Sequence, residues 1–412
     1  MENMNADHLL KNRDIVIVGQ QSWDVEIGSN CKNIALEFSK NNRVLYVNSP
    51  LDRITRLKQK ADPKVKKRIA VINGSLDGLI EIKQNLWNYY PDKLIESINW
   101  IKNEAIYNRL NKYNNRIFAR TIKKAINRLG FKNIILFNDS DMFRSFYLKE
   151  LLKPAVSVYY SRDYMLYVDY WKLHGEKLEP KLISKSDLCV ANSTYLASYC
   201  RQHNKNSFYV GQGCDLEMFM NKQDTPVPAD MIAIRKPVIG YVGALQSIRL
   251  DLALLEHIAK AKPEWSIVLV GPEDKEFTAS NLHQIENIHF LGGKDPNSLA
   301  GYINSFDVCL NPQIVNQVTI GNYPRKIDEY LAMGKPVVAT RTEAMSVFEQ
   351  YVYLGKTRED YVMLIEKALT EDSEEKRRAR VAFAATHSWE NSVNDIYKAI
   401  MQVEEAPDRP AR

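Results

Sequence analysis

Residues 324–338, PRKIDEYLAMGKPVV, give the strongest indication of local structure in this chain. The leading proline suits the first turn of a helix and Gly334 ends it, so the stretch predicts a short helix followed by a buried strand. Arg325 and Lys326 fall at the amino end of that helix, where backbone N–H groups lack partners and the helix dipole is positive. The pattern therefore indicates a place where a phosphate or diphosphate binds.

Glu329 lies one helical turn after Arg325 and shares its face. A carboxylate there could bind a sugar hydroxyl while the two cations bind phosphates. The alternative is an ordinary helix–strand unit with a solvated charged face. From this pattern alone the two interpretations stand level.

The composition describes a globular protein of more than one domain. The chain has 412 residues, 45% of them hydrophobic and 26% charged, which favours two domains. Residues 1–13 lack an apolar core, so we expect no signal peptide, and no apolar run is long enough for a membrane span. The cysteines are odd in number and never spaced as C-x-x-C, which favours reduced thiols in the cytoplasm over a zinc site. They are Cys31, Cys189, Cys200, Cys214 and Cys309.

Charge is unevenly distributed along the chain. Residues 1–215 hold 34 Lys and Arg against 22 Asp and Glu, whereas residues 216–412 hold 22 against 28. The excess gathers in residues 53–68 and 102–132, where cations alternate with apolar residues such as Ile106, Phe118 and Ile122. This pattern favours docking on an anionic membrane face, with a merely solvated helix as the equal alternative. No nucleic-acid-binding motif accompanies the charge, so we expect no nucleic acid partner.

The order of apolar runs predicts an α/β fold with two doubly wound, Rossmann-like domains. In the first half, short β-type runs occur at 14–19, 43–47, 133–137, 155–160 and 187–191, separated by helical segments. The alternation restarts at 238–243 and continues at 265–271, 288–292, 307–310 and 336–339. Continuous apolar runs of this length are typical of parallel sheets covered on both faces. Ligands of such sheets bind at the carboxyl ends of the strands, here in a cleft between two facing domains.

The domain limits follow from composition. We expect a first domain over residues 1–220 and a proline-containing linker over 221–237. A second domain then spans 238–388, and a helix over 389–405 returns to the first domain. No G-x-G-x-x-G follows either first strand, so no dinucleotide cofactor is indicated, although Gly243 would let a phosphate approach the backbone.

Several short motifs, in this order, give the chain a resemblance to the GT-B glycosyltransferases, and within them to bacterial enzymes that build surface polysaccharide. They are residues 187–193 (DLCVANS), 209–215 (YVGQGCD), 240–243 (GYVG), 270–272 (VGP), 290–292 (FLG) and 324–338. The resemblance is strongest over about residues 187–340. It implies a nucleotide-sugar donor linked to UDP or GDP as substrate, with no further cofactor. It also implies that residues 1–220 form the acceptor-binding domain and residues 238–388 the nucleotide-sugar-binding domain.

The resemblance also implies roles for matching positions. Glu329 is expected to bind the donor ribose. Gly243, Arg249, Arg325 and Lys326 are expected to surround the diphosphate, and Lys294 is a weaker candidate near the base. For Arg249 and Lys294 a plain surface charge is the alternative.

One departure from the family pattern concerns the reaction. Many retaining enzymes of this class carry a second glutamate eight positions before the one matched by Glu329, and here that position is Gly321. The stereochemical outcome therefore cannot be carried over. A nucleotide-sugar epimerase on the same fold and a non-catalytic nucleotide-sugar-binding subunit remain the alternatives to a transferase.

An inverting transferase needs a base near the acceptor hydroxyl. Asp163 is the first candidate because it follows the strand at 155–160, within a run of aromatics in which Tyr160 or Tyr164 could stack on a sugar. Asp24, in the loop after the first strand, is the second, ahead of Asp139 and Asp141. For Asp163 a loop carboxylate that caps the next segment is the alternative.

These observations predict a metal-independent glycosyltransferase of the hexosyltransferase type. We expect it to move a sugar from a nucleotide-diphosphate donor to a lipid-linked or polysaccharide acceptor, from a cytoplasmic position at the inner face of the membrane. Cations and helix amino ends can stabilise the leaving diphosphate, so no metal ligands are assigned.

Overall fold

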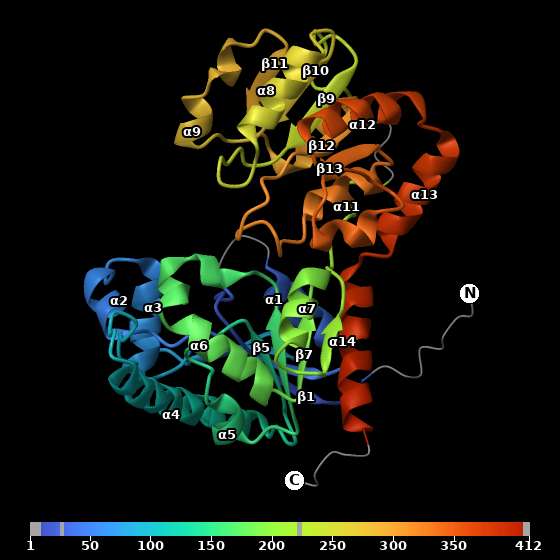
Figure 1. Ribbon diagram of the computed structural model, residues 1–412. Coiled ribbons are helices and arrows are strands. Elements are labelled where there is room, and N and C mark those ends of the chain that lie inside the picture. The colour runs from blue at the N-terminus through green and yellow to red at the C-terminus, as the bar shows by residue number, and fades with distance from the viewer. Residues whose placement is uncertain (1–9, 25–28, 221–224, 407–412) are drawn as a thin grey trace. The chain divides into compact units, whose positions relative to one another are not determined.

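The computed structural model describes residues 10–24, 29–220 and 225–406 (Figure 1). The chain divides into two domains. The first comprises residues 1–211 and 389–412, and the second comprises residues 212–388.

The first domain is built on a largely parallel sheet. Its described strands lie in the order β3-β4-β2-β1-β5-β6-β7-β8, and among them only β3 runs antiparallel to its neighbour. The strands are β1 (Asp14–Gly19), β2 (Arg43–Val47), β3 (Leu79–Lys83), β4 (Leu86–Tyr89), β5 (Ile135–Asp139), β6 (Val156–Ser161), β7 (Leu188–Ala191) and β8 (Ser207–Tyr209).

Helices cover both faces of this sheet. They are α1 (Asn30–Phe38), α2 (Arg53–Lys58), α3 (Pro63–Ile72), α4 (Glu104–Leu129), α5 (Leu148–Leu152), α6 (Asp169–Lys185), α7 (Thr194–Arg201) and α14 (Trp389–Glu404). Ile15 and Ile17 face α1 and α14, whereas Val16 and Val18 face α4. Because neighbouring residues of β1 are buried on opposite faces, the strand has to be apolar throughout, as the sequence shows.

The end of the chain belongs to the first domain. Figure 1 shows α14, coloured red, beside β7 and α7, and its residues Ile396 and Ile400 are fully buried in the same apolar cluster as α1. Tyr397 stacks on Phe38 with ring centroids 5.4 Å apart, and its hydroxyl accepts a hydrogen bond from Asn42.

The second domain repeats the architecture with a wholly parallel sheet. Its strand order is β11-β10-β9-β12-β13-β14, the central crossover placing β9 between β10 and β12. The strands are β9 (Val238–Val242), β10 (Ser266–Val270), β11 (Ile288–Gly292), β12 (Val308–Asn311), β13 (Val337–Thr340) and β14 (Tyr353–Gly355). Its helices are α8 (Leu252–Ala261), α9 (Lys275–Thr278), α10 (Leu299–Ser305), α11 (Arg325–Ala332), α12 (Arg358–Thr370) and α13 (Glu374–Ala385).

The predicted α/β fold with two Rossmann-like domains is confirmed. The β-type runs of the sequence coincide with strands to within two residues at most ends, for example 133–137 with β5 (Ile135–Asp139). Residues 221–224 of the predicted linker lie outside the described residues. Residues 225–237 pack with the second domain, where Met231 is buried and the Tyr302 hydroxyl donates to Asp230.

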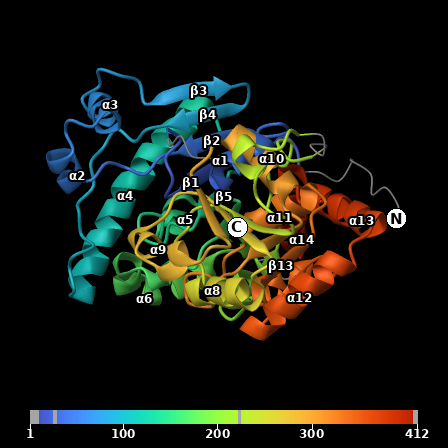
Figure 2. The same cartoon turned by 90° about the horizontal axis from the view of Figure 1, so that it is seen from above.

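The apolar residues of helix α4 do not form the exposed surface that was expected to dock on a membrane. Phe118 and Ile122 are buried against the sheet, so most of the apolar residues of 102–132 form core rather than an exposed surface. The cations of this helix, among them Arg116 and Arg120, are exposed on the outer face. Figure 2 shows α4 as the long helix that crosses the first domain. In the described ranges, no helix is long and apolar enough to cross a membrane.

Candidate active site

The amino end of α11 opens into a cavity of about 440 Å³ in the second domain. Loops that follow β9 and β12 form its other walls, as expected for the carboxyl edge of a parallel sheet. The predicted residues Arg249, Arg325, Lys326 and Glu329 all line it, together with Tyr241, Ala244, Gln246, Leu250, Asn311, Gln313, Asn322, Tyr323 and Pro324. The sequence prediction thus brings four of its six donor-site residues to one cavity.

The cations of α11 lie at the amino end of the helix. Pro324 takes the N-cap position and supplies no side-chain cap, and the backbone N–H groups of Arg325 and Ile327 donate to the carbonyls of Tyr323 and Pro324. Arg325 is exposed and Lys326 is half-buried. Positive side chains at a helix amino end are unfavourable to the free helix and favour a bound anion.

Gly243 touches the same cluster from the end of β9. A Cβ on Gly243 would lie 2.1 Å from Cε of Lys326, and its φ of +145° is a conformation that other residues rarely adopt. A Cβ on Gly271 would lie 1.9 Å from the Gly243 carbonyl oxygen. Gly243 is therefore required beside the Lys326 side chain, and Gly271 is required beside the Gly243 backbone.

Glu329 carries a carboxylate without a partner. No hydrogen bond or ion pair joins it to another described residue. Burial raises its pKa above the usual value, an effect that Lys326 and Arg325 oppose. A half-buried carboxylate that faces a cavity and lacks a donor is suited to accept hydrogen bonds from a ligand.

The neighbouring carboxylate, Asp328, has the opposite character. It is fully buried, its Oδ1 lies 2.6 Å from Nδ1 of His387, and its Oδ2 accepts a hydrogen bond from Cys214 at 3.2 Å. The Tyr323 hydroxyl lies 3.1 Å from the same His387 nitrogen. Asp328 thus ties α11 to residues near both ends of the second domain.

Sequence reasoning missed several polar residues of this cavity, including Gln246, Asn311 and Gln313. Asn311 is the last residue of β12, it is 2% exposed, and its Nδ2 has no hydrogen-bond partner. A polar residue at the carboxyl end of a buried strand was the available signal. Lys294 does not line the cavity: its Nζ is held by Asp230 at 2.7 Å, outside this group of residues.

In the first domain, Asp163 belongs to a chain of charges at the ends of β5 and β6. Arg162 donates through Nη1 to Asp163 at 2.8 Å and through Nε to Asp139 at 2.7 Å. Asp139 is fully buried and its second oxygen has no partner, whereas Asp163 is 49% exposed. Asp139 and Asp163 raise the pKa of Arg162 despite its burial, so the guanidinium stays charged between the two carboxylates.

Asp24 lies in a separate group. Its Oδ2 accepts a hydrogen bond from the Tyr90 hydroxyl at 3.1 Å, and Lys67 donates to the same hydroxyl. Its Oδ1 is buried without a partner. No contact between the described residues joins Asp24 directly to Asp163.

The aromatic residues near Asp163 are less available than expected. Tyr160 is 1% exposed and lies in the core beneath the sheet, so it cannot stack on a sugar. Tyr164 is half-buried and packs edge-on against Tyr195 and Tyr199. The alternation of β6 explains this, because Tyr160 points into a covered face.

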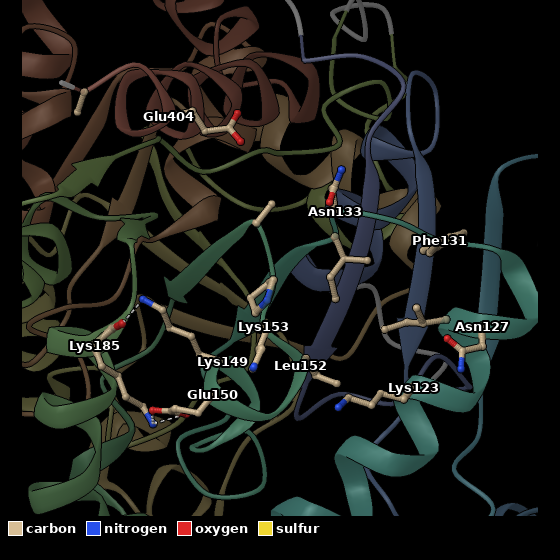
Figure 3. A pocket seen from close by; sticks show the side chains of 15 residues that line it. Lys123, Asn127, Phe131, Asn133, Lys149, Glu150, Leu152, Lys153, Lys185 and Glu404 are labelled. Atoms are coloured by element: carbon tan, nitrogen blue, oxygen red, sulfur yellow. Dashed lines mark hydrogen bonds and ion pairs between the residues drawn. The ribbon is translucent and has the colours of Figure 1, made fainter. Parts of the chain in front are cut away.

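A larger cavity of the first domain, about 1250 Å³, lies away from these residues. Residues just before β5 and β6 line it, so it is at the amino edge of the sheet, opposite Asp139 and Asp163. Figure 3 shows Lys185 beside Glu150 on one of its walls, an ion pair of 3.0 Å. Within the described residues, no group of three His, Cys, Asp or Glu side chains is arranged to hold a metal ion.

Comparison with known proteins agrees with this geometry. Residues 236–369 match the family described as Glycosyl transferases group 1. These residues contain β9 to β14 and the whole lining of the α11 cavity. The second domain is a glycosyl transferase group 1 domain.

A sequence relative points in the same direction. The chain is 24% identical over 277 residues to TuaH of Bacillus subtilis (strain 168), a protein named for a role as a glycosyltransferase in teichuronic acid biosynthesis. The matched part covers 60% of this chain and 68% of TuaH.

Solved structures show that the whole chain has the GT-B fold. A trehalose-phosphate synthase from Burkholderia vietnamiensis matches with a TM-score of 0.65 at 10% identity, covering 98% of this chain and all of that chain. Sucrose-phosphate synthase from Thermosynechococcus elongatus gives 0.60 at 15% identity, with coverage of 96% and 99%. Anabaena Alr3699/HepE, solved in complex with UDP, gives 0.59 at 14% identity, with coverage of 95% and 99%.

Substitution of the two neighbouring carboxylates of α11 should change the stability of the protein in opposite directions. Asp328→Asn is expected to lower the free energy of unfolding by about 1–3 kcal/mol, because a buried charged hydrogen bond to His387 is lost. Glu329→Gln is expected to raise the free energy of unfolding at pH 7. Urea unfolding monitored by fluorescence measures both.

The effect of Glu329→Gln on the free energy of unfolding should depend on pH. Burial raises the pKa of Glu329, so the folded domain holds this proton to higher pH than the unfolded chain. The stability that the protonated Glu329 contributes is present below pH 4.5 and is lost as pH rises through the raised pKa. The gain in unfolding free energy of Glu329→Gln over the unsubstituted protein should therefore grow from pH 4.5 upward. An advantage that is constant with pH contradicts this account of Glu329.

Proposed function

We propose that this protein is a glycosyltransferase that moves a sugar from a UDP- or GDP-linked donor to a lipid-linked or polysaccharide acceptor in surface glycan synthesis. The observation that carries the proposal is the α11 cavity, where Arg249, Arg325 and Lys326 converge with the unpartnered carboxylate of Glu329. The cations suit a diphosphate and the carboxylate suits the ribose hydroxyls. UDP is bound by one structural neighbour and TuaH is named for a polysaccharide, which supports both halves of the proposal.

The leaving group is stabilised without a metal ion in this proposal. Breaking the sugar–phosphate bond places negative charge on the diphosphate, and Arg325 and Lys326 at the amino end of α11 line the cavity that would hold it. Gly243 lies against the Lys326 side chain, where a larger residue would fill the space. We assign a hexose as the transferred sugar.

Acceptor activation belongs to the first domain. Asp163, exposed and paired with Arg162, is the proposed base, and Asp24 is the second candidate. Asp139 is a positioning residue, because it is buried and acts on Asp163 through Arg162. A nucleotide-sugar epimerase would need no acceptor, so incubation of the donor alone distinguishes the two activities.

Donor binding gives the first test. In a thermal-shift panel of UDP- and GDP-linked hexoses, at least one donor should raise the unfolding temperature, since a ligand of the folded state stabilises it. Glu329→Gln should weaken that donor by roughly 1–3 kcal/mol, because a charge-assisted hydrogen bond is lost. Calorimetry with UDP and GDP measures the affinity. Glu276→Gln, a first-turn glutamate of α9, is the control. Unchanged affinity in the Glu329 variant contradicts the donor assignment.

Acceptor-dependent release of nucleotide tests the base. Asp163→Asn should reduce this release by about 10²–10⁴-fold and leave donor affinity unchanged, because a general base acts only in the transfer step. Glu176→Gln, an exposed carboxylate of α6, is the matched control. Full activity of Asp163→Asn contradicts its role as the general base. Asp24 is then the remaining candidate, and the same assay tests it through Asp24→Asn.

We also propose that the protein works at the cytoplasmic face of the membrane, docked through the outer face of α4. Arg116, Arg120 and Lys123 are exposed there and have no ion-pair partner in the described part of the chain. Each cation near an anionic surface contributes about 1 kcal/mol.

Vesicle sedimentation tests the docking face. Replacing Arg116, Arg120 and Lys123 together by Ala should lower binding to vesicles rich in phosphatidylglycerol by roughly a hundredfold, in line with three cations at about 1 kcal/mol each. The same change at Arg235, Lys275 and Lys356, exposed cations of the second domain, is the control. Binding that is indifferent to salt and to these substitutions contradicts the proposal.

A further inference from the structure

A second cavity of the first domain, about 570 Å³, lies beside the carboxyl edge of its sheet. Its walls come from the segments that follow β2, β5 and β6, from residues 95–100 and from the amino-terminal half of α4. Neither Asp24 nor Asp163 lines it. It is therefore distinct from the groups around Asp24 and Asp163, although segments that follow β5 and β6 contribute to it as well.

Aromatic rings form an exposed platform at this cavity. Trp100 is 71% exposed and Tyr170 is 55% exposed, and both line it. The Trp100 indole is fixed by donation of its Nε1 to the Ser97 carbonyl at 2.8 Å, and Tyr170 packs edge-on against Trp171. Large exposed rings held in place are unfavourable in water and are typical of a binding surface.

Beneath the platform the rings are buried and stacked. Tyr107 is 1% exposed and lies against His174 with ring centroids 3.5 Å apart, and Phe143 stacks on Trp171 at 5.2 Å. These contacts hold the start of α6 against α4. The exposed rings therefore rest on a rigid base.

Two amide groups at the cavity lack partners. Oδ1 of Asn99 and Nδ2 of Asn111 are buried, and neither has a hydrogen-bond partner among the described residues. Asn111 is 2% exposed, and Asn99 is held in place by donation of its Nδ2 to the Tyr170 carbonyl at 2.8 Å. One group is an acceptor and the other a donor, so a ligand with hydroxyl groups can satisfy both, because a hydroxyl donates and accepts.

The charged residues that line the cavity disfavour anionic ligands. Its lining contains Asp52, Glu96 and Asp169 against the single cation Arg144, which pairs with Asp141. This balance repels a phosphate or a lipid headgroup. A lipid chain would leave the amide groups unpaired, which costs free energy.

We propose that this cavity is a carbohydrate subsite that holds a neutral sugar ring of the acceptor glycan, stacked on Trp100 and Tyr170 and hydrogen-bonded to Asn99 and Asn111. The inference rests on the proposed function, because it gives the acceptor its binding site. It also specifies the acceptor's chemistry. The glycan itself, rather than only a lipid diphosphate, is recognised by the first domain.

Saturation-transfer NMR tests the subsite with named probes. The full chain is titrated with the methyl glycosides of glucose, galactose, N-acetylglucosamine and N-acetylgalactosamine, and with maltotetraose and chitotetraose. At least one probe is expected to bind, and Trp100→Ala and Tyr170→Ala should each weaken it at least tenfold. More than half of each side chain is exposed, and a urea-unfolding curve of each variant checks that the fold is retained. Tyr113→Ala, an equally exposed ring on α4 that does not line the cavity, should leave binding unchanged.

The outcomes are separable from those of the proposed function. Failure of every probe to bind, or binding that survives both substitutions, overturns the subsite. Displacement of the sugar by undecaprenyl phosphate in detergent overturns it in favour of a lipid site. UDP and GDP calorimetry on the same variants reports the donor cavity independently. Sugar binding without nucleotide binding therefore contradicts the proposed function while the subsite stands.

Discussion

Parallel strands impose the constraint on which both domains depend. Every segment that follows a parallel strand begins at the same edge of the sheet, so residues far apart in the chain are gathered there. In the second domain this edge brings Asn311 and the α11 cations to one cavity, with Gly243 against the Lys326 side chain. In the first it brings Asp139, at the end of β5, to Arg162 and Asp163, which follow β6. The opposite edge of the first domain holds a larger cavity with none of these residues.

Helix α11 shows how adjacent carboxylates acquire different roles from burial and partners. Asp328 points inward, is fully buried, and is held by His387 and Cys214, so it contributes to structure. Glu329 points to the cavity, has no partner within the described chain, and has a raised pKa, so it costs stability. A partly buried charge without a partner is unfavourable unless a ligand supplies one. The same helix is therefore anchored through one residue and presents an unpaired carboxylate of the described chain to the cavity through the next.

Much of the fold could be predicted because buried parallel strands are continuous apolar runs, as in β1 and β10. The grouping of Arg325, Lys326 and Glu329 at one cavity was also predictable, since they lie within about one helical turn. Residues joined only by tertiary contacts were less accessible. Lys294 is drawn to Asp230, 64 positions away, and Tyr160 is buried by the alternation of its strand. The cavity at Trp100 combines segments between residues 50 and 173, and no local pattern in the sequence indicates it.

Helix α4 contributes to both proposed interactions of the first domain, with the glycan and with the membrane, because its helical period places the two sets of residues on different sides. Positions 107, 111 and 114 face inward and supply Tyr107, Asn111 and Asn114 to the carbohydrate cavity. Positions 109, 116, 120 and 123 face outward and carry the cations proposed to meet the membrane. Because 3.6 residues form one turn, the two sets lie on different sides of one rigid rod. An anionic surface on one side and a neutral glycan on the other can thus be bound together, since the charges that attract the first are kept out of the cavity that takes the second.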